Sequence, residues 1–221
     1  MNYSIAQFAL LGFLTFTLVG LITPQIRKVA LHFNAVDAPN LERKVQKEPV
    51  PYLGGVAIAI GVVAASYGSM LAVDFSWQTI RLASTVLVPA IAISAMGLWD
   101  DLRGLQPWPR LIAQTFTGIV VSSILIATDT SGVAFGNTFL NYAVTTLWIV
   151  GVCNSINFFD NHDGGAAGTV AVITFFTFFI AYDRQQVLVS ALAIVTAGAT
   201  AGFLIWNRHP AKIYMGDAGS D

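Results

Sequence analysis

Charged residues and cysteines are scarce in this sequence. Of its 221 residues only 10% are Asp, Glu, Lys or Arg, whereas 55% are apolar, and the mean hydropathy is +0.68. Soluble domains carry about 25% charged residues, so the composition argues against an ordinary soluble domain. The single cysteine, Cys153, excludes an internal disulfide. The formal net charge is −1, and we expect no nucleic-acid partner.

The scarce charges leave long apolar runs between them. Seven stretches contain no Asp, Glu, Lys or Arg: 1–26, 49–73, 82–99, 111–128, 130–159, 164–182 and 185–207. About 20 apolar helical residues span a bilayer, and a charge at its centre costs at least ~2.5 kcal/mol. The alternative is a soluble protein with buried helices, but such helices would still meet water on one side and show a polar face there, which these runs lack. The sequence therefore predicts an all-α, polytopic transmembrane bundle of about seven helices, forming a single integral membrane domain over residues 1–221.

The basic residues are distributed unevenly between the connections. Nine of the eleven Lys and Arg residues lie in the connections after the odd-numbered runs, namely the first, third and seventh. Only Arg81 and Arg184 lie in the connections after even-numbered runs. Positively charged connections stay in the cytoplasm. We therefore expect the N-terminus outside the cell and the odd-numbered connections in the cytoplasm.

Four polar segments fall on the side that this topology makes cytoplasmic. They are VDAPNLERKVQKEPVPYLGG (36–55), GLWDDLRGLQPWPRLIAQ (97–114), NSINFFDNHDGGAAG (154–168) and WNRHPAKIYMGDAGSD (206–221). Nine of the twelve acidic residues lie on this side as well. Carboxylates gathered where cations are already concentrated indicate a functional site.

Asp100 and Asp101 stand at the end of an apolar run. Two adjacent carboxylates do not ionise together at low cost unless a cation is near, and either a divalent metal or a basic side chain such as Arg110 would supply it. A solvated helix end is the simpler explanation of such a pair taken alone. Asp217, between two glycines, likewise either meets a phosphate together with free backbone N–H groups or is a solvated turn residue.

Asn154, Asn157, Asp160 and Asp163 recur every three residues. On a continuous helix they would share one ridge. Oxygen ligands of this kind suit Mg²⁺, which takes one or two protein groups and completes its shell with water and substrate phosphates. A polar ridge that joins helices by hydrogen bonds is the alternative, but carboxylates at membrane depth favour a functional role.

Together the four segments resemble the polyprenyl-phosphate N-acetylhexosamine-1-phosphate transferases. The resemblance runs from Asp37 to Ser220 through DAPNLERK with PVPYLGG, GLWDDLRGLQPWPRL, NSINFFDNHDG and GFLIWNRHPAKIYMGDAGS, in this order. It implies a multi-pass enzyme of the bacterial inner membrane that transfers a sugar 1-phosphate from a UDP-N-acetylhexosamine to a polyprenyl phosphate such as undecaprenyl phosphate. UMP leaves, and the reaction is the first lipid-linked step of cell-envelope polysaccharide synthesis.

The resemblance also implies roles for individual residues. Asp100 would bind or deprotonate the lipid phosphate, Asp101 would support it, and Asp217 would complete the catalytic set. Mg²⁺, with Mn²⁺ as a substitute, would be bound by Asp217 and Asn157. The substrate-binding residues would be Lys44, Arg110, Asn154, Asp160, Asp163 and Asn207. Among the partners we expect membrane lipids, and a homodimer is left open.

The chain departs from the family pattern at its end. Members normally continue past the GDAGS segment into further helices, so we expect this sequence to lack the C-terminal helices of the family. Two rival explanations remain. A transporter or channel would also contain intramembrane acids, but near the bilayer midplane on broken helices. A truncated, non-catalytic relative would have kept the motifs by descent.

Overall fold

The computed structural model describes residues 3–37, 49–72, 76–104, 106–128 and 136–220. Its helices are α1 (Ile5–His32), α2 (Gly54–Ala72), α3 (Trp77–Arg103), α4 (Pro107–Ala127), α5 (Thr138–Phe159), α6 (Gly165–Asp183), α7 (Val187–Asn207) and the short α8 (Asp217–Ser220), and two short strands are β1 (Val36–Asp37) and β2 (Val50–Pro51). Seven of these helices are long and apolar enough to cross a membrane. The predicted helical membrane bundle is confirmed.

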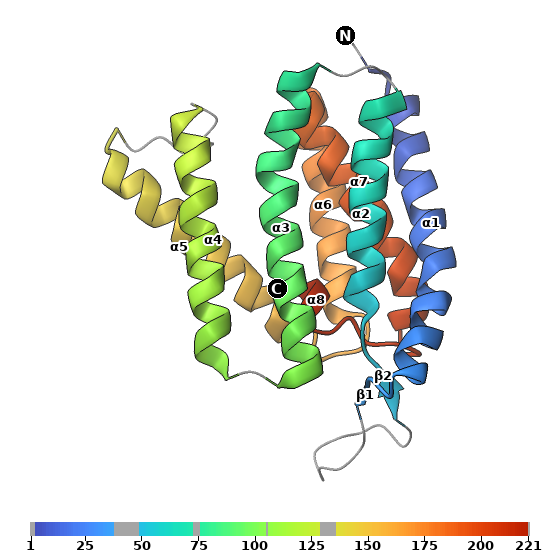
Figure 1. The fold of residues 1–221 in the computed structure, drawn as a ribbon. Coiled ribbons are helices and arrows are strands. Elements are labelled where there is room, and N and C mark those ends of the chain that lie inside the picture. Colours follow the sequence, from blue (N-terminus) through green and yellow to red (C-terminus); the bar gives the residue numbers. More distant parts are fainter. Residues whose placement is uncertain (1–2, 38–48, 73–75, 105, 129–135, 221) are drawn as a thin grey trace.

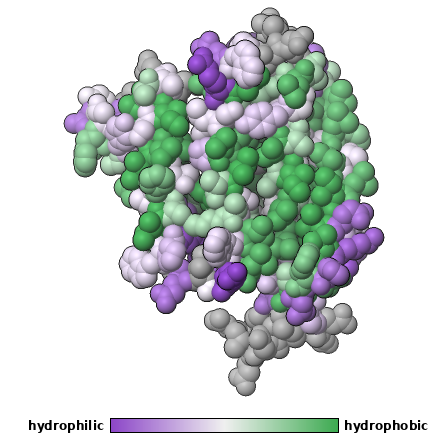
Figure 2. Space-filling model, in the orientation of Figure 1, coloured by the Kyte–Doolittle hydropathy of each residue, from purple (hydrophilic) through white to green (hydrophobic). Residues whose placement is uncertain are grey.

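The long helices alternate in direction, so their connections gather at two ends (Figure 1). We call the end at which α1, α3, α5 and α7 finish the motif end, because the described parts of the four polar segments lie there. Figure 2 shows apolar side chains over the middle of the bundle and polar residues towards its ends. Such a belt is the surface that lipid requires. The orientation of the N-terminus relative to the cell stays a prediction.

Helix α7 lies at the centre of the bundle and packs closely on α1. A methyl group on Gly198 would overlap the carbonyl oxygen of Gly12, and one on Gly202 would overlap that of Phe16. Small residues allow this backbone approach, which is the usual way in which membrane helices associate. The indole N–H of Trp206 also donates to the carbonyl oxygen of Gly20 at 2.9 Å. The packing of α7 on α1 therefore fixes the position at which the segment after α7 begins.

Helices α4 and α5 form a hairpin that diverges from the other helices (Figure 1). The hydroxyls of Ser122 and Thr146 lie 3.1 Å apart across it, and Asn154 Nδ2 donates to Gln114 Oε1 at 2.7 Å. None of the α5 residues is buried. The hairpin meets the main bundle mainly at the motif end, where α5 contacts α8.

Candidate active site

The candidate site depends on how α8 is seated among the long helices. After α7 the chain turns back, pairs with the segment before α2 through a bridge between Tyr52 and Tyr214, and enters the bundle as α8. This helix packs on α3 and α2. The hydroxyl of Ser94 donates to the carbonyl oxygen of Ala218 at 2.6 Å. Asp217, the first residue of α8, is thereby brought beside the end of α3.

Two glycines make room for α8. A Cβ atom on Gly97 would overlap the carbonyl group of Asp217, and one on Gly55 would overlap the backbone of Gly219. Both neighbours are main-chain atoms, which cannot turn aside as a flexible side chain can. The glycines of the LGG and GLWDD segments therefore set the distance between α8 and the helices on either side of it.

Four helices, α3, α4, α5 and α8, meet around the carboxylate of Asp217. Arg110 Nη1 lies 3.1 Å from Asp217 Oδ2 and 3.6 Å from Asp100 Oδ2, so one guanidinium is shared by two carboxylates. Asn157 Nδ2 donates to Asp217 Oδ1 at 2.8 Å and to Ser220 Oγ at 3.0 Å. Asp100 is buried, whereas Asp217 is partly open to solvent. The structure thus brings together Asp100, Arg110, Asn157 and Asp217, which the sequence analysis had singled out.

Two further carboxylates hold the backbone that leads into α8. Asp101 accepts hydrogen bonds from the amides of Asp217 at 3.0 Å and Ala218 at 3.2 Å. Asp160 accepts one from the amide of Gly216 at 3.2 Å. The N–H groups at the start of a helix have no partner within that helix, so carboxylates are natural acceptors for them. Asp101 and Asp160 therefore position Asp217, in addition to any direct role in chemistry.

Three of the remaining predicted residues lie in the described part of the chain, around this cluster. Asp163 and Asn207 join the turn before α6 to the segment after α7, by contacts described below. Asn154 donates to Gln114 and to the carbonyl oxygen of Val150, so its amide is directed along the α4–α5 hairpin. Lys44 lies outside the described residues. These four assignments as substrate-binding residues stay predictions.

The expected helical ridge does not extend over its whole length. α5 ends at Phe159, with Asp160 as its C-cap, and Asp163 lies in the turn that follows. Gly164 adopts φ +73°, a left-handed conformation that ends the turn and begins α6. The prediction of one continuous ridge is therefore wrong beyond Asp160, because the glycines after Asp163 favour a turn over a continued helix.

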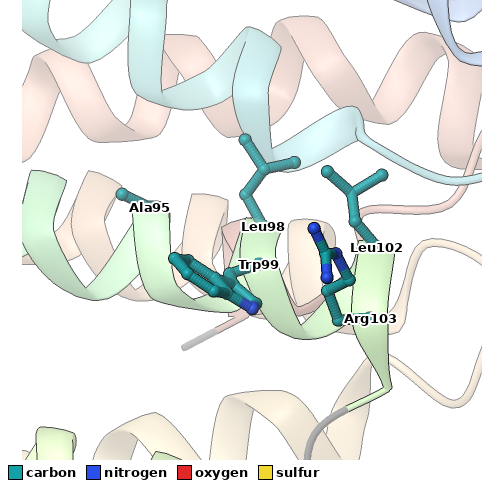
Figure 3. Close-up of a pocket in the computed structure, with 5 residues that line it drawn as sticks. All are labelled: Ala95, Leu98, Trp99, Leu102 and Arg103. Atoms are coloured by element: carbon teal, nitrogen blue, oxygen red, sulfur yellow. The ribbon is translucent and has the colours of Figure 1, made fainter.

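A groove of about 300 Å³ lies on α3 (Figure 3), and the residues that line it are close to Asp100 and Asp101 in the sequence. Its lining residues are Ala95, Leu98, Trp99, Leu102 and Arg103. The helix presents Gly97 and Asp101 to α8, and each residue step turns a helix by about 100°. Ala95, Trp99 and Arg103, each two positions away from these residues, therefore lie on another face. The groove is therefore separate from the cluster around Asp217.

The sequence comparisons place this geometry in a known family. Residues 83–221 match the sequence profile of glycosyl transferase family 4. The chain belongs to this family. Among its glycosyl transferase family 4 relatives, a probable undecaprenyl-phosphate N-acetylglucosaminyl 1-phosphate transferase from Bacillus subtilis (strain 168) is 38% identical over 206 residues, or 90% of this chain and 55% of the relative.

Two other relatives carry related names. A decaprenyl-phosphate N-acetylglucosaminephosphotransferase from Mycolicibacterium smegmatis is 31% identical over 241 aligned positions, with coverage of 97% of this chain and 57% of the relative. A phospho-N-acetylmuramoyl-pentapeptide-transferase from Levilactobacillus brevis is 28% identical over 194 positions, with coverage of 79% and 58%. The family 4 chain thus spans little more than half the length of these curated relatives.

Burial sets the electrostatics of the family 4 site. Desolvation raises the pKa of Asp160 to about 7; the hydrogen bond from Gly216 lowers it, whereas the charges of Asp217 and Asp101 raise it further. Desolvation also raises the pKa of Asp217, against the opposing effects of Asn157 and Arg110. Buried carboxylates that lie close together favour the protonated form. A divalent metal would relieve the repulsion between their charges and favour the ionised form.

The raised pKa of Asp160 predicts a pH-dependent stability. Because folding raises this pKa, the folded protein binds a proton that the unfolded chain releases above about pH 4, and the resulting stabilisation is lost as the pH rises through about 7. Asp160→Asn, which stays neutral and keeps an acceptor for Gly216, should raise Tm by roughly 5 °C at pH 7.5 without divalent metal and change it little at pH 4. Thermal unfolding in detergent at both pH values measures this. An equal change at the two values would contradict the assignment.

Some residues of the site escaped the sequence analysis. Ser220 and Gln114 bind Asn157 and Asn154, and His209 binds Asp163. Ser220, His209 and Gln114 all stand inside the polar segments, so their position was an indication of a role. The indication was weaker for Gln114, which is fully buried in α4, because a single amide in an apolar run is also a common helix-joining residue.

Proposed function

We propose that this chain forms part of a metal-dependent enzyme that transfers an N-acetylhexosamine 1-phosphate from a UDP-sugar to a polyprenyl phosphate. The observation that carries the proposal is the convergence of Asp100, Asn157, Asp217 and Arg110 at the motif end of the bundle. The names of the relatives support the class of reaction. Since this chain covers only part of their length, its substrates and activity are part of the proposal.

The donor set fits a divalent cation. Asp100 and Asp217 already direct one oxygen each at a single cationic group, the guanidinium of Arg110. Within the described ranges, no three His, Cys, Asp or Glu side chains are arranged to hold a metal by themselves. Mg²⁺ is commonly bound by one or two carboxylates together with water and substrate phosphates. Asp217 would hold the ion, with Asn157 as a further ligand, and when bound it would neutralise charge on the diphosphate.

The protein groups then have distinct tasks in the transfer. An oxygen of the lipid phosphate attacks the β-phosphorus of the UDP-sugar, the bond from this phosphorus to the bridging oxygen breaks, and UMP leaves with that oxygen. Asp100, on the helix that ends at the membrane surface, would accept a proton from the lipid phosphate. Arg110 would bind phosphate oxygens as charge develops on them. Asp101 and Asp160 keep Asp217 in place through the backbone amides at the start of α8.

The position of the cluster suits a lipid substrate. The carboxylates lie where α3 and α5 end, not at the middle of the long helices. A polyprenyl phosphate carries its phosphate at the level of the lipid headgroups, so the two would meet without charge entering the hydrocarbon. We propose that this end faces the cytoplasm, as the distribution of Lys and Arg indicates. The same position argues against a transporter, which would need its acids near the bilayer midplane.

A single assay tests the proposal. The chain in lipid nanodiscs is expected to release UMP from UDP-N-acetylglucosamine only when polyprenyl phosphate and Mg²⁺ are both present, with Mn²⁺ as a weaker substitute. UDP-N-acetylmuramoyl-pentapeptide should be a poorer donor, in accord with the higher identity to the N-acetylglucosaminyl relatives. Absence of UMP under all conditions would favour a non-catalytic relative, and substrate-driven flux without UMP would favour a transporter.

A further inference from the structure

Asp163 joins two loops that are far apart in the sequence. Its Oδ2 atom lies 2.8 Å from Nδ1 of His209 and accepts a hydrogen bond from the amide of Ala211 at 3.0 Å. Asp163 belongs to the turn between α5 and α6, whereas His209 and Ala211 belong to the segment that leads from α7 to α8. One carboxylate oxygen therefore binds both a side chain and the backbone of the segment that carries Asp217.

Asn207 makes a second tie between the same loops. Its Oδ1 atom accepts from the amide of Gly164 at 3.0 Å, and its Nδ2 atom donates to the carbonyl oxygen of Ile213 at 3.0 Å. Asn207 is almost completely buried, at 1% exposure. Asn207 therefore has a structural role, since a buried amide without hydrogen-bond partners would destabilise the protein. The turn before α6 is thus attached to the last segment at two neighbouring points.

These ties control the path of the chain into the candidate site. The segment after Ala211 is next held by Asp160 at Gly216 and by Asp101 at Asp217 and Ala218. With Asp163 at its start and Asp160 and Asp101 at its end, it is fixed by carboxylates at both ends. A displacement of the backbone at Ala211 would also displace Asp217, because only five residues separate the two.

We propose that Asp163 and His209 form a positioning pair that sets the place of Asp217 by holding the backbone at Ala211. The inference rests on the proposed function for its kinetic consequence, but not for its structural one. It differs from the expectation that Asp163 binds the substrate directly, for example at its nucleotide. The carboxylate of Asp163 is mostly shielded, at 22% side-chain exposure, whereas the imidazole of His209 is open, at 83%. A polar contact with one partner open to solvent contributes little to global stability, so the effect of the pair would be local.

Matched substitutions separate positioning from nucleotide contact. Asp163→Ala removes both hydrogen bonds, whereas Asp163→Asn keeps an oxygen that accepts them. His209→Ala removes the side-chain half of the pair at an exposed position and serves as the second variant should Asp163→Ala fail to fold. Asp183→Asn, an exposed carboxylate at the opposite end of α6, is the control. Hydrogen–deuterium exchange of residues 208–218 and steady-state UMP release are measured for each.

Positioning predicts a specific pattern. Asp163→Ala should raise amide exchange in residues 211–217 by about tenfold and lower kcat by about tenfold, with KM for the UDP-sugar within about twofold of the original value. Asp163→Asn should restore most of both properties, and adding His209→Ala to Asp163→Ala should have little further effect. Asp183→Asn should change nothing.

Other patterns overturn the proposal. Unchanged exchange in residues 211–217 for both Asp163→Ala and His209→Ala would show that the pair does not hold the segment. A rise in KM with unchanged kcat and exchange would mean that Asp163 binds the nucleotide itself. If the wild-type chain releases no UMP, the proposed function fails, whereas the exchange measurements still decide whether the pair positions the segment.

Discussion

Asp217→Asn is expected to reduce UMP release by at least about a thousandfold. The carboxylate of Asp217 is the group on which the other parts of the site converge: Oδ1 accepts from Asn157 and Oδ2 lies against Arg110. An amide has only one acceptor oxygen, so one of these donors would face an NH₂ group. The substitution also removes a negative charge that would bind the divalent cation. Geometry and charge are therefore lost together, which makes the expected effect large.

The control for Asp217→Asn is a carboxylate with no part in the site. Asp183→Asn makes the same chemical change at the other end of the bundle and should leave UMP release within about twofold of the original. Mg²⁺ affinity, measured by titrating the rate, should fall for Asp217→Asn only. Full activity of Asp217→Asn at saturating Mg²⁺ would refute the role of this residue in binding metal.

The helices could be predicted from the sequence because the bilayer imposes a simple rule. A charge-free run must be helical to satisfy its backbone in lipid, and each of the seven runs corresponds to one long helix. Their ends were less predictable. α3 begins at Trp77 and continues to Arg103, past Arg81, Asp100 and Asp101, because a helix does not stop where the hydrocarbon does. In α3 the run therefore marks the span but underestimates the length of the helix.

The seating of α8 could not be predicted. It depends on how Gly97 in α3 and Gly55 in α2 face each other across the backbone of Gly219 and Asp217, and this is a property of the packed bundle. In sequence each glycine is one of several in apolar helices. The short MGDAGS segment gave no sign that it would enter between helices instead of staying at the surface.

The acids of the site were found because acids are rare in this chain, but the sequence did not show which of them hold the backbone. Asp101 and Asp160 accept backbone N–H groups, whereas Asp100 and Asp217 share Arg110. Residue type is the same in all four cases, and the distinction lies in which donors are near. Sequence patterns identify a concentration of carboxylates, whereas only the folded structure shows which of them hold the backbone.

Gly97→Ala is expected to impair the site without touching any polar group in it. The added methyl group would overlap the carbonyl group of Asp217 and press on the amide of Ala218, both of which are main-chain atoms. α8 must therefore move away from α3, and the hydrogen bonds from Asp217 and Ala218 to Asp101 would stretch or break. A displacement of about 1 Å at a catalytic group costs on the order of a hundredfold in rate, so kcat should fall by about this factor.

The matched control for Gly97→Ala is Gly68→Ala. Gly68 is also a glycine in a long helix, but a Cβ atom there would meet nothing within 4 Å. Alanine favours a helix over glycine by roughly 0.5–1 kcal/mol, so Gly68→Ala should keep its activity and unfold at the same or a slightly higher temperature. Alanine has the same preference for a helix at position 97, so any loss of activity in Gly97→Ala must come from the contact with α8. Equal activity of the two variants would mean that α8 is not held against α3 as the structure has it, because the overlap at Gly97 leaves no way to keep this contact and add a methyl group.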